Sequence, residues 1–181
     1  MDVAAVVLTL DMNDKPEAEL VEACRRKDVA AFETLYKRYG ARMKSVAYHV
    51  LGNRADAEDA VHEAFVNAYR GIGQFRGDSS IVTWLCHIAV NVCYNQARRK
   101  QREVQLVMEP ERATPGPGMR VALESALKLI HPKRRMVFLL YESEGFTHAE
   151  IAAVLDIREG TSKAWLSEAK QELRKILGAS K

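Results

Sequence analysis

The sequence predicts an all-α protein built from two small helical domains. Apolar residues recur with a period near 3.6 along most of the chain, and no run of alternating β-branched residues is long enough for a sheet. The periodicity stops after about Val104, where Pro110, Pro115 and Pro117 stand among glycines, a composition typical of a flexible linker. We therefore expect an N-terminal extension at 1–14, a first domain at 15–103, a linker at 104–118 and a second domain at 119–181.

The first domain opens with two predicted helices. Asp14 followed by Pro16 indicates the start of the first helix, which should end near Lys27. Asp28 is a suitable N-cap for the second helix, because its carboxylate can accept hydrogen bonds from the free amides of the first turn. Apolar residues then continue at helical spacing until Gly52, where we expect the second helix to end.

The third predicted helix separates an apolar face from an acidic one. It should begin at Asp56, as N-cap, and end at Gly71. One set of residues follows the spacing of a single buried face: Ala57, Ala60, Val61, Ala64, Phe65, Ala68 and Tyr69. The polar residues of the same helix should then lie outside: Glu58, Asp59, His62 and Glu63.

A polar loop leads from there into a fourth helix that ends in a basic cluster. Its predicted core stripe is Ile81, Trp84, Leu85, Ile88, Ala89 and Val92. The cluster consists of Arg98, Arg99, Lys100 and Arg102, and it holds more positive charge than the C-terminal end of a helix dipole requires. The formal net charge of +3 permits a nucleic-acid partner without requiring one, so the local surplus is the better indication of a polyanionic partner.

The second domain is predicted to contain a helix-turn-helix motif. Helices are expected at 119–130 and 132–143, and Thr147 with Glu150 forms a capping box that should start a short helix. That helix should break at Asp156, before a long helix at 159–177. The second helix of such a motif enters the major groove of DNA, where its exposed residues would be Arg158, Thr161, Ser162, Lys163, Ser167 and Lys170. From this motif alone, an amphipathic helix pair with a solvated charged face is an equal alternative.

The cysteines and the N-terminus indicate no disulfide framework, metal site or membrane span. Cys24, Cys86 and Cys93 lack a metal-binding spacing and are too few for a framework, which suits a reducing cytoplasm and a packing role. The apolar stretch from Val3 to Leu10 is far shorter than the roughly 20 residues that a membrane span needs.

Several short motifs, taken in their order along the chain, resemble those of a known family, the extracytoplasmic-function (ECF) group of sigma factors. The second conserved region of that group is similar to Asp56-Ala57-Glu58-Asp59, Glu63-Ala64-Phe65, Phe75-Arg76-Gly77-Asp78, Thr83-Trp84-Leu85, Ile88-Ala89-Val90-Asn91 and Arg98-Arg99. The fourth region is similar to Glu150-Ile151-Ala152, Gly160-Thr161, Lys163 and Leu166. Each motif is weak alone, but in this order they are highly specific, and the similarity extends from Pro16 to Leu177.

The resemblance implies a sigma factor that binds core RNA polymerase and directs promoter recognition, DNA melting and transcription initiation. It implies that the acidic helix binds the clamp of the largest polymerase subunit through Asp56, Glu58, Asp59, His62 and Glu63. It implies capture of the melted minus-ten element by residues of the loop and the fourth helix: Phe75, Arg76, Gly77, Asp78, Ser79, Ser80, Trp84, Asn91, Arg98 and Arg99. Of these, we expect Trp84 to be chiefly a core residue, because it lies on an apolar stripe.

The same resemblance implies that the second domain reads the minus-thirty-five element as duplex DNA through the helix-turn-helix. It also implies an anti-sigma protein as a partner. We expect a cytoplasmic protein that is monomeric outside its complexes, inserts in no membrane, needs no cofactor or metal and catalyses no reaction.

The sequence departs from the family at three of these positions. His62 stands where the family usually has Gln, and Trp165 and Glu168 stand where it often has basic residues. The candidates for phosphate contacts in the second domain are then Lys170, Arg174 and Lys175.

Two other functions would each explain part of the sequence. A stand-alone helix-turn-helix regulator would explain the C-terminal half, but it leaves the acidic helix and the basic cluster unexplained, and it would usually be a dimer. A metal-dependent enzyme could use the acidic residues of the third helix. Carboxylates on one exposed helix face lack the converging ligands and enclosed pocket that catalysis needs.

Overall fold

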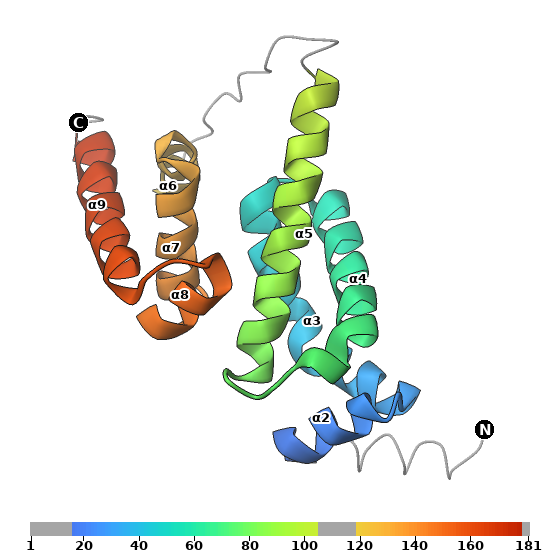
Figure 1. Ribbon diagram of the computed structural model, residues 1–181. Helices are drawn as coiled ribbons and strands as arrows, with labels where there is room; N and C mark the ends of the chain where they lie inside the picture. The colour runs from blue at the N-terminus through green and yellow to red at the C-terminus, as the bar shows by residue number, and fades with distance from the viewer. Residues whose placement is uncertain (1–15, 105–118, 179–181) are drawn as a thin grey trace. The chain divides into compact units, whose positions relative to one another are not determined.

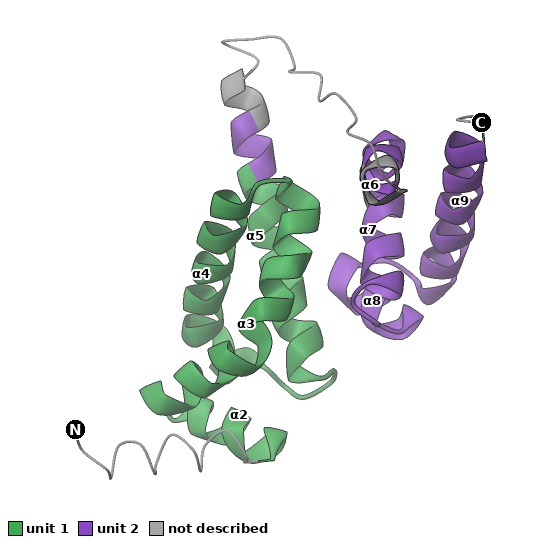
Figure 2. Cartoon of the chain, turned by 180° about the vertical axis from the view of Figure 1, so that it is seen from behind, with its two compact units in different colours: residues 1–96 green, residues 97–181 purple. Residues whose placement is uncertain are grey.

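The computed structural model describes residues 16–104 and 119–178, and within these ranges all regular structure is helical (Figure 1). This confirms the all-α prediction. The chain divides into two compact units, residues 1–96 and 97–181 (Figure 2). The predicted extension and nearly all of the predicted linker lie outside the described residues, and the domain boundaries that we expected stay predictions. None of the described helices is long and apolar enough to cross a membrane.

The first unit contains the helices α2 (Glu17–Arg25), α3 (Val29–Leu51) and α4 (Arg54–Gly71), a 3-10 turn η1 (Ile72–Gln74) and most of α5 (Ile81–Val104). α3 packs along α4, and α2 packs against α3 and η1. The unit has a fully buried apolar core that includes Leu20, Leu35, Met43, Val46, Val61, Ile72, Ile81 and Leu85. The packed helices α3 and α4 therefore form the structural framework that carries polar surfaces of this unit.

The helix boundaries confirm some sequence predictions and correct others. Asp28 caps α3 and accepts hydrogen bonds from the amides of Ala30 and Ala31 at 2.9 and 3.3 Å, and Gly52 ends this helix with φ +68°. The cap of α4, however, is Asn53, whose Oδ1 accepts from the amides of the two residues after Arg54. The prediction that Asp56 caps this helix was wrong, because the cap lies three residues earlier in the chain.

The first helix is also shorter than we expected. α2 begins at Glu17 and ends at Arg25, while Asp14, the predicted start, lies outside the described residues. Lys27, the predicted end, has φ +65° in the left-handed region, so the helix cannot continue through it.

The second unit contains α6 (Met119–Leu129), α7 (Pro132–Glu142), α8 (His148–Leu155) and α9 (Glu159–Gly178). Its core contains Ala126, Leu127, Ile130, Leu139, Ala169 and Leu173, with Phe138 and Ile176 packed against it. The capping box is formed: the Thr147 hydroxyl accepts from the Glu150 amide, and the Glu150 carboxylate accepts from the Thr147 amide. Asp156, at φ +53°, ends α8 in the tight turn before α9. The predicted helix-turn-helix geometry is therefore present.

Candidate partner and nucleic-acid interfaces

The acidic residues of α4 lie on its outer face. Glu58, Asp59, His62 and Glu63 are exposed, and Asp56 is half-buried. The Glu63 carboxylate accepts a hydrogen bond from Nε2 of Gln96 on α5 at 3.2 Å, which orients it. The face thus offers several carboxylates to one partner, and among the described residues no group of three or more His, Cys, Asp or Glu side chains could hold a metal ion.

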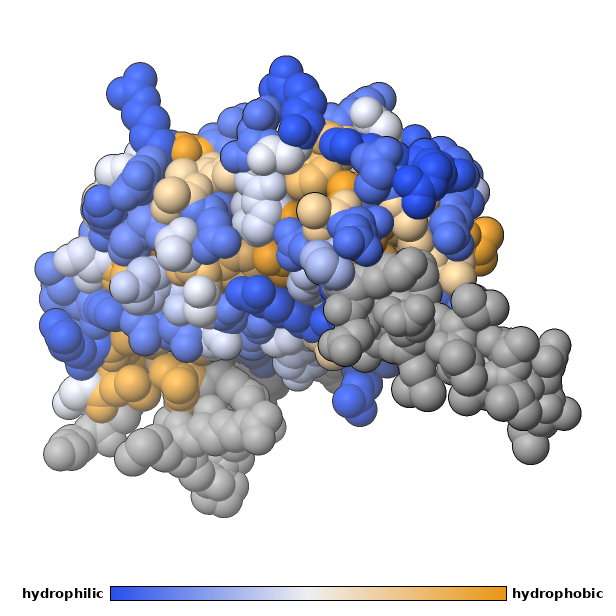
Figure 3. Space-filling view, turned by 90° about the horizontal axis from the view of Figure 1, so that it is seen from below, coloured by the Kyte–Doolittle hydropathy of each residue, from blue (hydrophilic) through white to orange (hydrophobic). Residues whose placement is uncertain are grey.

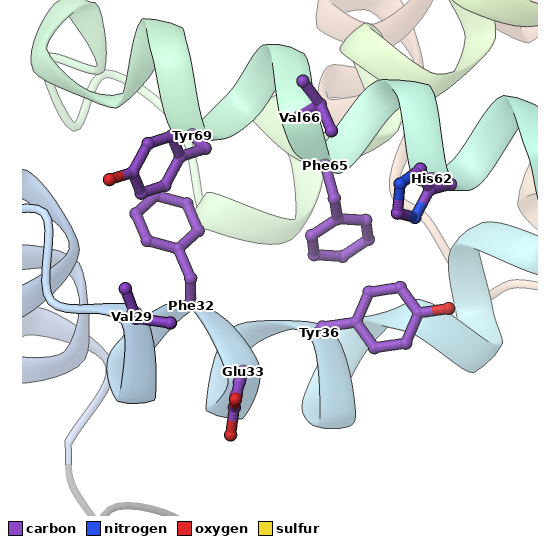
Figure 4. A pocket seen from close by; sticks show the side chains of 8 residues that line it. All are labelled: Val29, Phe32, Glu33, Tyr36, His62, Phe65, Val66 and Tyr69. Atoms are coloured by element: carbon purple, nitrogen blue, oxygen red, sulfur yellow. The ribbon is translucent and has the colours of Figure 1, made fainter.

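An apolar groove of about 630 Å³ lies beside this acidic face, between α3 and α4. Its lining residues are Val29, Phe32, Glu33, Tyr36, His62, Phe65, Val66 and Tyr69 (Figure 4). Two edge-to-face ring pairs line it, Phe32 with Tyr69 and Tyr36 with Phe65, each with ring centroids 4.8 Å apart. His62 contributes to both surfaces, so the acidic face and the groove adjoin.

Sequence reasoning missed this groove. Tyr69 was predicted to be buried but is 37% exposed, and it lines the groove. Val29 is 63% exposed and Val66 is 36% exposed, although both are β-branched apolar residues on helices. These two apolar residues lie outside the buried stripes of their helices, and this position was the sequence feature that could have predicted the groove. Elsewhere, hydrophilic side chains cover much of the face shown in Figure 3, with apolar residues in patches between them.

The loop between η1 and α5 presents a short polar segment above a buried aromatic ring. Arg76 and Asp78 form an exposed ion pair at 3.1 Å across Gly77, which has φ +83°. Phe75 is only 8% exposed, and its ring contacts Trp84 with centroids 5.4 Å apart. The DNA contact of Phe75 stays a prediction, and in this structure its side chain is buried in the unit.

The remaining predicted minus-ten residues lie on the loop and on α5. Ser79 and Ser80 are half-buried, and the Ser80 hydroxyl lies 2.8 Å from that of Thr83 and accepts from the Thr83 amide at 3.3 Å. Trp84 is half-buried, as a chiefly structural residue would be. Asn91 is exposed and lies 3.0 Å from Nε2 of His87. Arg98 and Arg99 are also exposed.

On the recognition helix α9, the structure separates exposed from buried candidates. Arg158, Lys163 and Ser167 are exposed, while Thr161 and Lys170 are half-buried. Ser162 is fully buried, and its hydroxyl lies 3.0 Å from Nδ1 of His148 on α8. This side chain is therefore not exposed for contact with DNA in this structure, and instead links α8 to α9.

Two cations of α9, Lys163 and Lys170, are already paired with carboxylates. Lys163 contacts Glu159 at 2.7 Å, and the hydrogen bond from this lysine lowers the pKa of Glu159. Lys170 contacts Glu142 of α7 at 2.6 Å. Together with Ser167 and Arg174, these lysines line a shallow hollow on the exposed side of α9. A polyanion that binds there must compete with two ion pairs.

The departure from the family at Glu168 has a structural explanation. Its carboxylate pairs with Nε of Arg134 on α7 at 2.7 Å, and Nη1 of Arg134 pairs with Glu172 one turn further along α9. Glu168 therefore takes part in the contact of α9 with α7.

Family models match most of both units. The model of Sigma-70 region 2 matches residues 35–103, and the model of Sigma-70, region 4 matches residues 120–173. The ECF RNA polymerase sigma-E factor of Escherichia coli is 30% identical over 173 residues, covering 85% of this chain and 90% of its own. The ECF RNA polymerase sigma factor SigM of Mycobacterium tuberculosis is 28% identical over 170 residues, covering 92% of this chain and 87% of its own.

Two solved structures share the fold. The sigma factor RpoE in complex with the anti-sigma factor NepR from Bartonella quintana has a TM-score of 0.70 at 24% identity, covering 84% of this chain and 100% of that one. CnrH in complex with the cytosolic domain of CnrY has a TM-score of 0.71 at 23% identity, covering 91% and 99%. With both family models matched in order on two helical units, this chain belongs to the ECF group of sigma-70-type RNA polymerase sigma factors, and it directs transcription initiation as an alternative sigma factor.

Proposed function

We propose that three separate surfaces divide the work of promoter recognition. The acidic face of α4 and the adjoining groove bind the clamp of the largest polymerase subunit. The loop after η1, together with α5, captures the melted minus-ten element. The helix-turn-helix of α8 and α9 reads the minus-thirty-five element as duplex DNA. The observation that carries this proposal is that charge gathers by element: carboxylates lie on the exposed face of α4, and cations lie at the end of α5 and on the exposed side of α9.

The polymerase contact is supported by the chemistry of its two adjoining parts. Opposite charges across an interface mainly steer association and fix its register, whereas a desolvated apolar groove supplies affinity. Glu58, Asp59 and Glu63 would steer association, and the aromatic rings that line the groove would supply affinity. The partner surface should therefore carry basic residues beside an apolar side chain.

The minus-ten contact is supported by a polar loop that begins next to a buried aromatic pair, Phe75 and Trp84. Extruding a base from a DNA stack costs a few kcal/mol, which hydrogen bonds and stacking must offset. Arg76, Asp78 and the two serines offer hydrogen-bonding groups, and Asn91 offers an amide on α5. Arg98 and Arg99 would contact phosphates. Phe75 would act from below, by supporting the loop through Trp84.

In the second unit, Arg158, Thr161, Lys163, Ser167 and Lys170 are the proposed minus-thirty-five contacts, with Arg174 and Lys175 on phosphates. Because Lys163 and Lys170 are paired with Glu159 and Glu142, DNA binding must exchange these ion pairs for phosphates. Each phosphate contact also releases counterions, so affinity should fall steeply as salt increases.

We further propose that an anti-sigma protein silences this chain by covering these surfaces, as the solved complexes with NepR and CnrY suggest. The protein would act in the cytoplasm, where polymerase and promoters are, by binding alone and without catalysis of its own.

The test is transcription by bacterial core polymerase, with the purified protein, from a library of promoter fragments. The double variant Asp56→Ala/Asp59→Ala should bind core polymerase at least about tenfold more weakly, because it loses two carboxylates from one charged contact. The control Glu19→Ala/Glu22→Ala removes two exposed carboxylates from α2 and should leave core affinity unchanged. A protein that shifts duplex DNA as a homodimer but never binds core polymerase would instead be a stand-alone regulator.

A further inference from the structure

Two side chains of α2 form hydrogen bonds at opposite ends of the loop at residues 76–80, called here the minus-ten loop. At the start of the loop, Nη2 of Arg25 donates a hydrogen bond to the carbonyl oxygen of Phe75 at 2.5 Å. At its end, the amide of Ile81 donates to Oε1 of Glu17 at 3.4 Å. Glu17 and Arg25 are two helical turns apart and share one face of α2. One helix therefore spans the whole loop.

The Glu17 carboxylate is itself fixed in position. Its second oxygen, Oε2, accepts a hydrogen bond from the hydroxyl of Tyr39 on α3 at 2.7 Å. Burial and this hydrogen bond raise the pKa of Tyr39 to about 12, so the phenol stays a donor at neutral pH. A carboxylate at the first amide of α5 also faces the positive end of the helix dipole. Ser80 accepts from the amide of Thr83, so the first turn of α5 is capped partly from the loop and partly from α2.

Arg25 also makes an exposed ion pair within its own helix. Its Nη1 pairs with the carboxylate of Glu22, one turn earlier on α2, at 3.1 Å. The residue whose carbonyl it holds, Phe75, is anchored from the other side by its buried ring against Trp84. The entry to the loop is thus fixed by the core on one side and by a guanidinium on the other.

We propose that Glu17 and Arg25 are positioning residues for minus-ten recognition. They restrict the loop at residues 76–80 to the conformations that bind the melted strand, and so set how strongly the protein discriminates among minus-ten sequences. A segment ordered before binding loses less conformational entropy when its ligand arrives, and misplaced hydrogen-bonding groups discriminate poorly. The inference rests on the proposed function of this loop.

The test uses holoenzyme assembled from the full-length protein and core polymerase. The probes are the best-transcribed fragment of the promoter library and versions with single base changes in the minus-ten or minus-thirty-five element. A mismatched base typically costs about fivefold or more in affinity. In Glu17→Ala and Arg25→Ala we expect the penalty for minus-ten changes to shrink about threefold or more, while the minus-thirty-five penalty and core affinity stay as in the unmutated protein. Amide exchange at Ile81 should be faster in Glu17→Ala.

Two matched controls separate positioning from general damage. Glu22→Ala removes the ion pair with Arg25 but leaves the contact with Phe75, and Arg25→Lys keeps a charged donor, so both should retain most of the discrimination. Unchanged minus-ten penalties in Glu17→Ala and Arg25→Ala would overturn the inference. An equal loss at both promoter elements, or an equal loss in Glu22→Ala, would also overturn it. If the unmutated protein gives no core-dependent transcription, the proposed function itself fails, and the inference fails with it.

Discussion

Single polar side chains decide where several of the helices begin. Asp28 and Asn53 both accept hydrogen bonds from two first-turn amides, and Thr147 and Glu150 satisfy each other's backbone donors. In each case a short acceptor side chain occupies a position that lies outside the helix but within reach of its free amides. At this scale a substitution should change stability by the value of one capping bond.

The cap at Asn53 gives a direct test. Asn53→Ala should lower the free energy of unfolding by about 1 kcal/mol, because two amides of α4 lose their acceptor. Denaturant unfolding followed by Trp84 fluorescence would measure it. Asn53→Asp keeps an acceptor and should stay close to the unmutated protein. Equal stability of all three proteins would show that the cap contributes nothing.

The cysteines should be inert in the folded protein. All three are buried and none forms a disulfide, and burial raises the pKa of Cys24 to about 11 and that of Cys93 to about 12. Because a thiol reacts as its thiolate, these two should resist alkylation by iodoacetamide at pH 8 and react rapidly once denaturant exposes them. Peptide mass spectrometry after pulsed alkylation would check this. Rapid labelling of Cys93 in the native protein would contradict its burial.

The raised thiol pKa values also have a sign for stability. A thiol that stays protonated in the folded state ionises more readily in the unfolded state, so folding loses stability as pH rises. The contribution of Cys24 and Cys93 is fully present below pH 9, the ordinary thiol value, and declines between pH 9 and about 11 to 12. This pH window lies above neutral pH, where the buried thiols act only as packing groups.

At the scale of elements, hydrogen bonds between helices set the geometry of the helix-turn-helix. His148 at the start of α8 stacks on Tyr141 of α7 with ring centroids 4.7 Å apart, and its Nδ1 lies 3.0 Å from the buried Ser162 hydroxyl of α9. One side chain therefore joins all three helices. The separation of α8 from the recognition helix depends on this contact as well as on apolar packing.

A double-mutant cycle would isolate that contact. Ser162→Ala should cost about 1 kcal/mol of stability, because His148 loses a buried partner. In a His148→Phe background the same substitution should cost much less, since the pair is already broken. Urea unfolding followed by Trp165 fluorescence provides the measurement. Ser167→Ala, on the exposed side of α9, should be near neutral for stability, and strictly additive costs at 148 and 162 would argue against the link.

At the scale of the whole molecule, each unit has its own apolar core and one of the two tryptophans. Trp84 reports on the first unit and Trp165 on the second. Met43 is fully buried in the first core, and Leu173 is 5% exposed in the second. Separate cores allow each unit to be destabilised without altering a buried residue of the other.

This predicts two distinguishable unfolding transitions. Met43→Ala should lower the stability of the first unit by about 2–5 kcal/mol, and the Trp84 signal should then move to lower urea. The Trp165 signal should keep its midpoint, and Leu173→Ala should give the reverse result. Measurements in Trp165→Phe and Trp84→Phe backgrounds separate the signals. A common shift of both signals would mean that the chain unfolds as one cooperative body.

The sequence by itself determined the helical class, the helix-turn-helix, the acidic face of α4 and the family. These features depend on local rules: helical period, capping residues and turn residues act within a few positions of each other, so they can be read along the chain. The cap at Asn53 shows the limit, because Asn53 and Asp56 both satisfy the local rule and only the observed helix start chooses between them.

Only the tertiary structure decided which candidate residues are accessible and which distant residues cooperate. Phe75 and Ser162 were predicted to face DNA, but packing against Trp84 and His148 buries them. The groove forms only because α3 and α4 lie side by side. The hydrogen bonds that hold the minus-ten loop join Arg25 to Phe75, 50 positions away, and Glu17 to Ile81, 64 positions away. Such contacts have no sequence period. They exist because burial of the apolar faces brings the helices together, and that arrangement is a property of the whole unit.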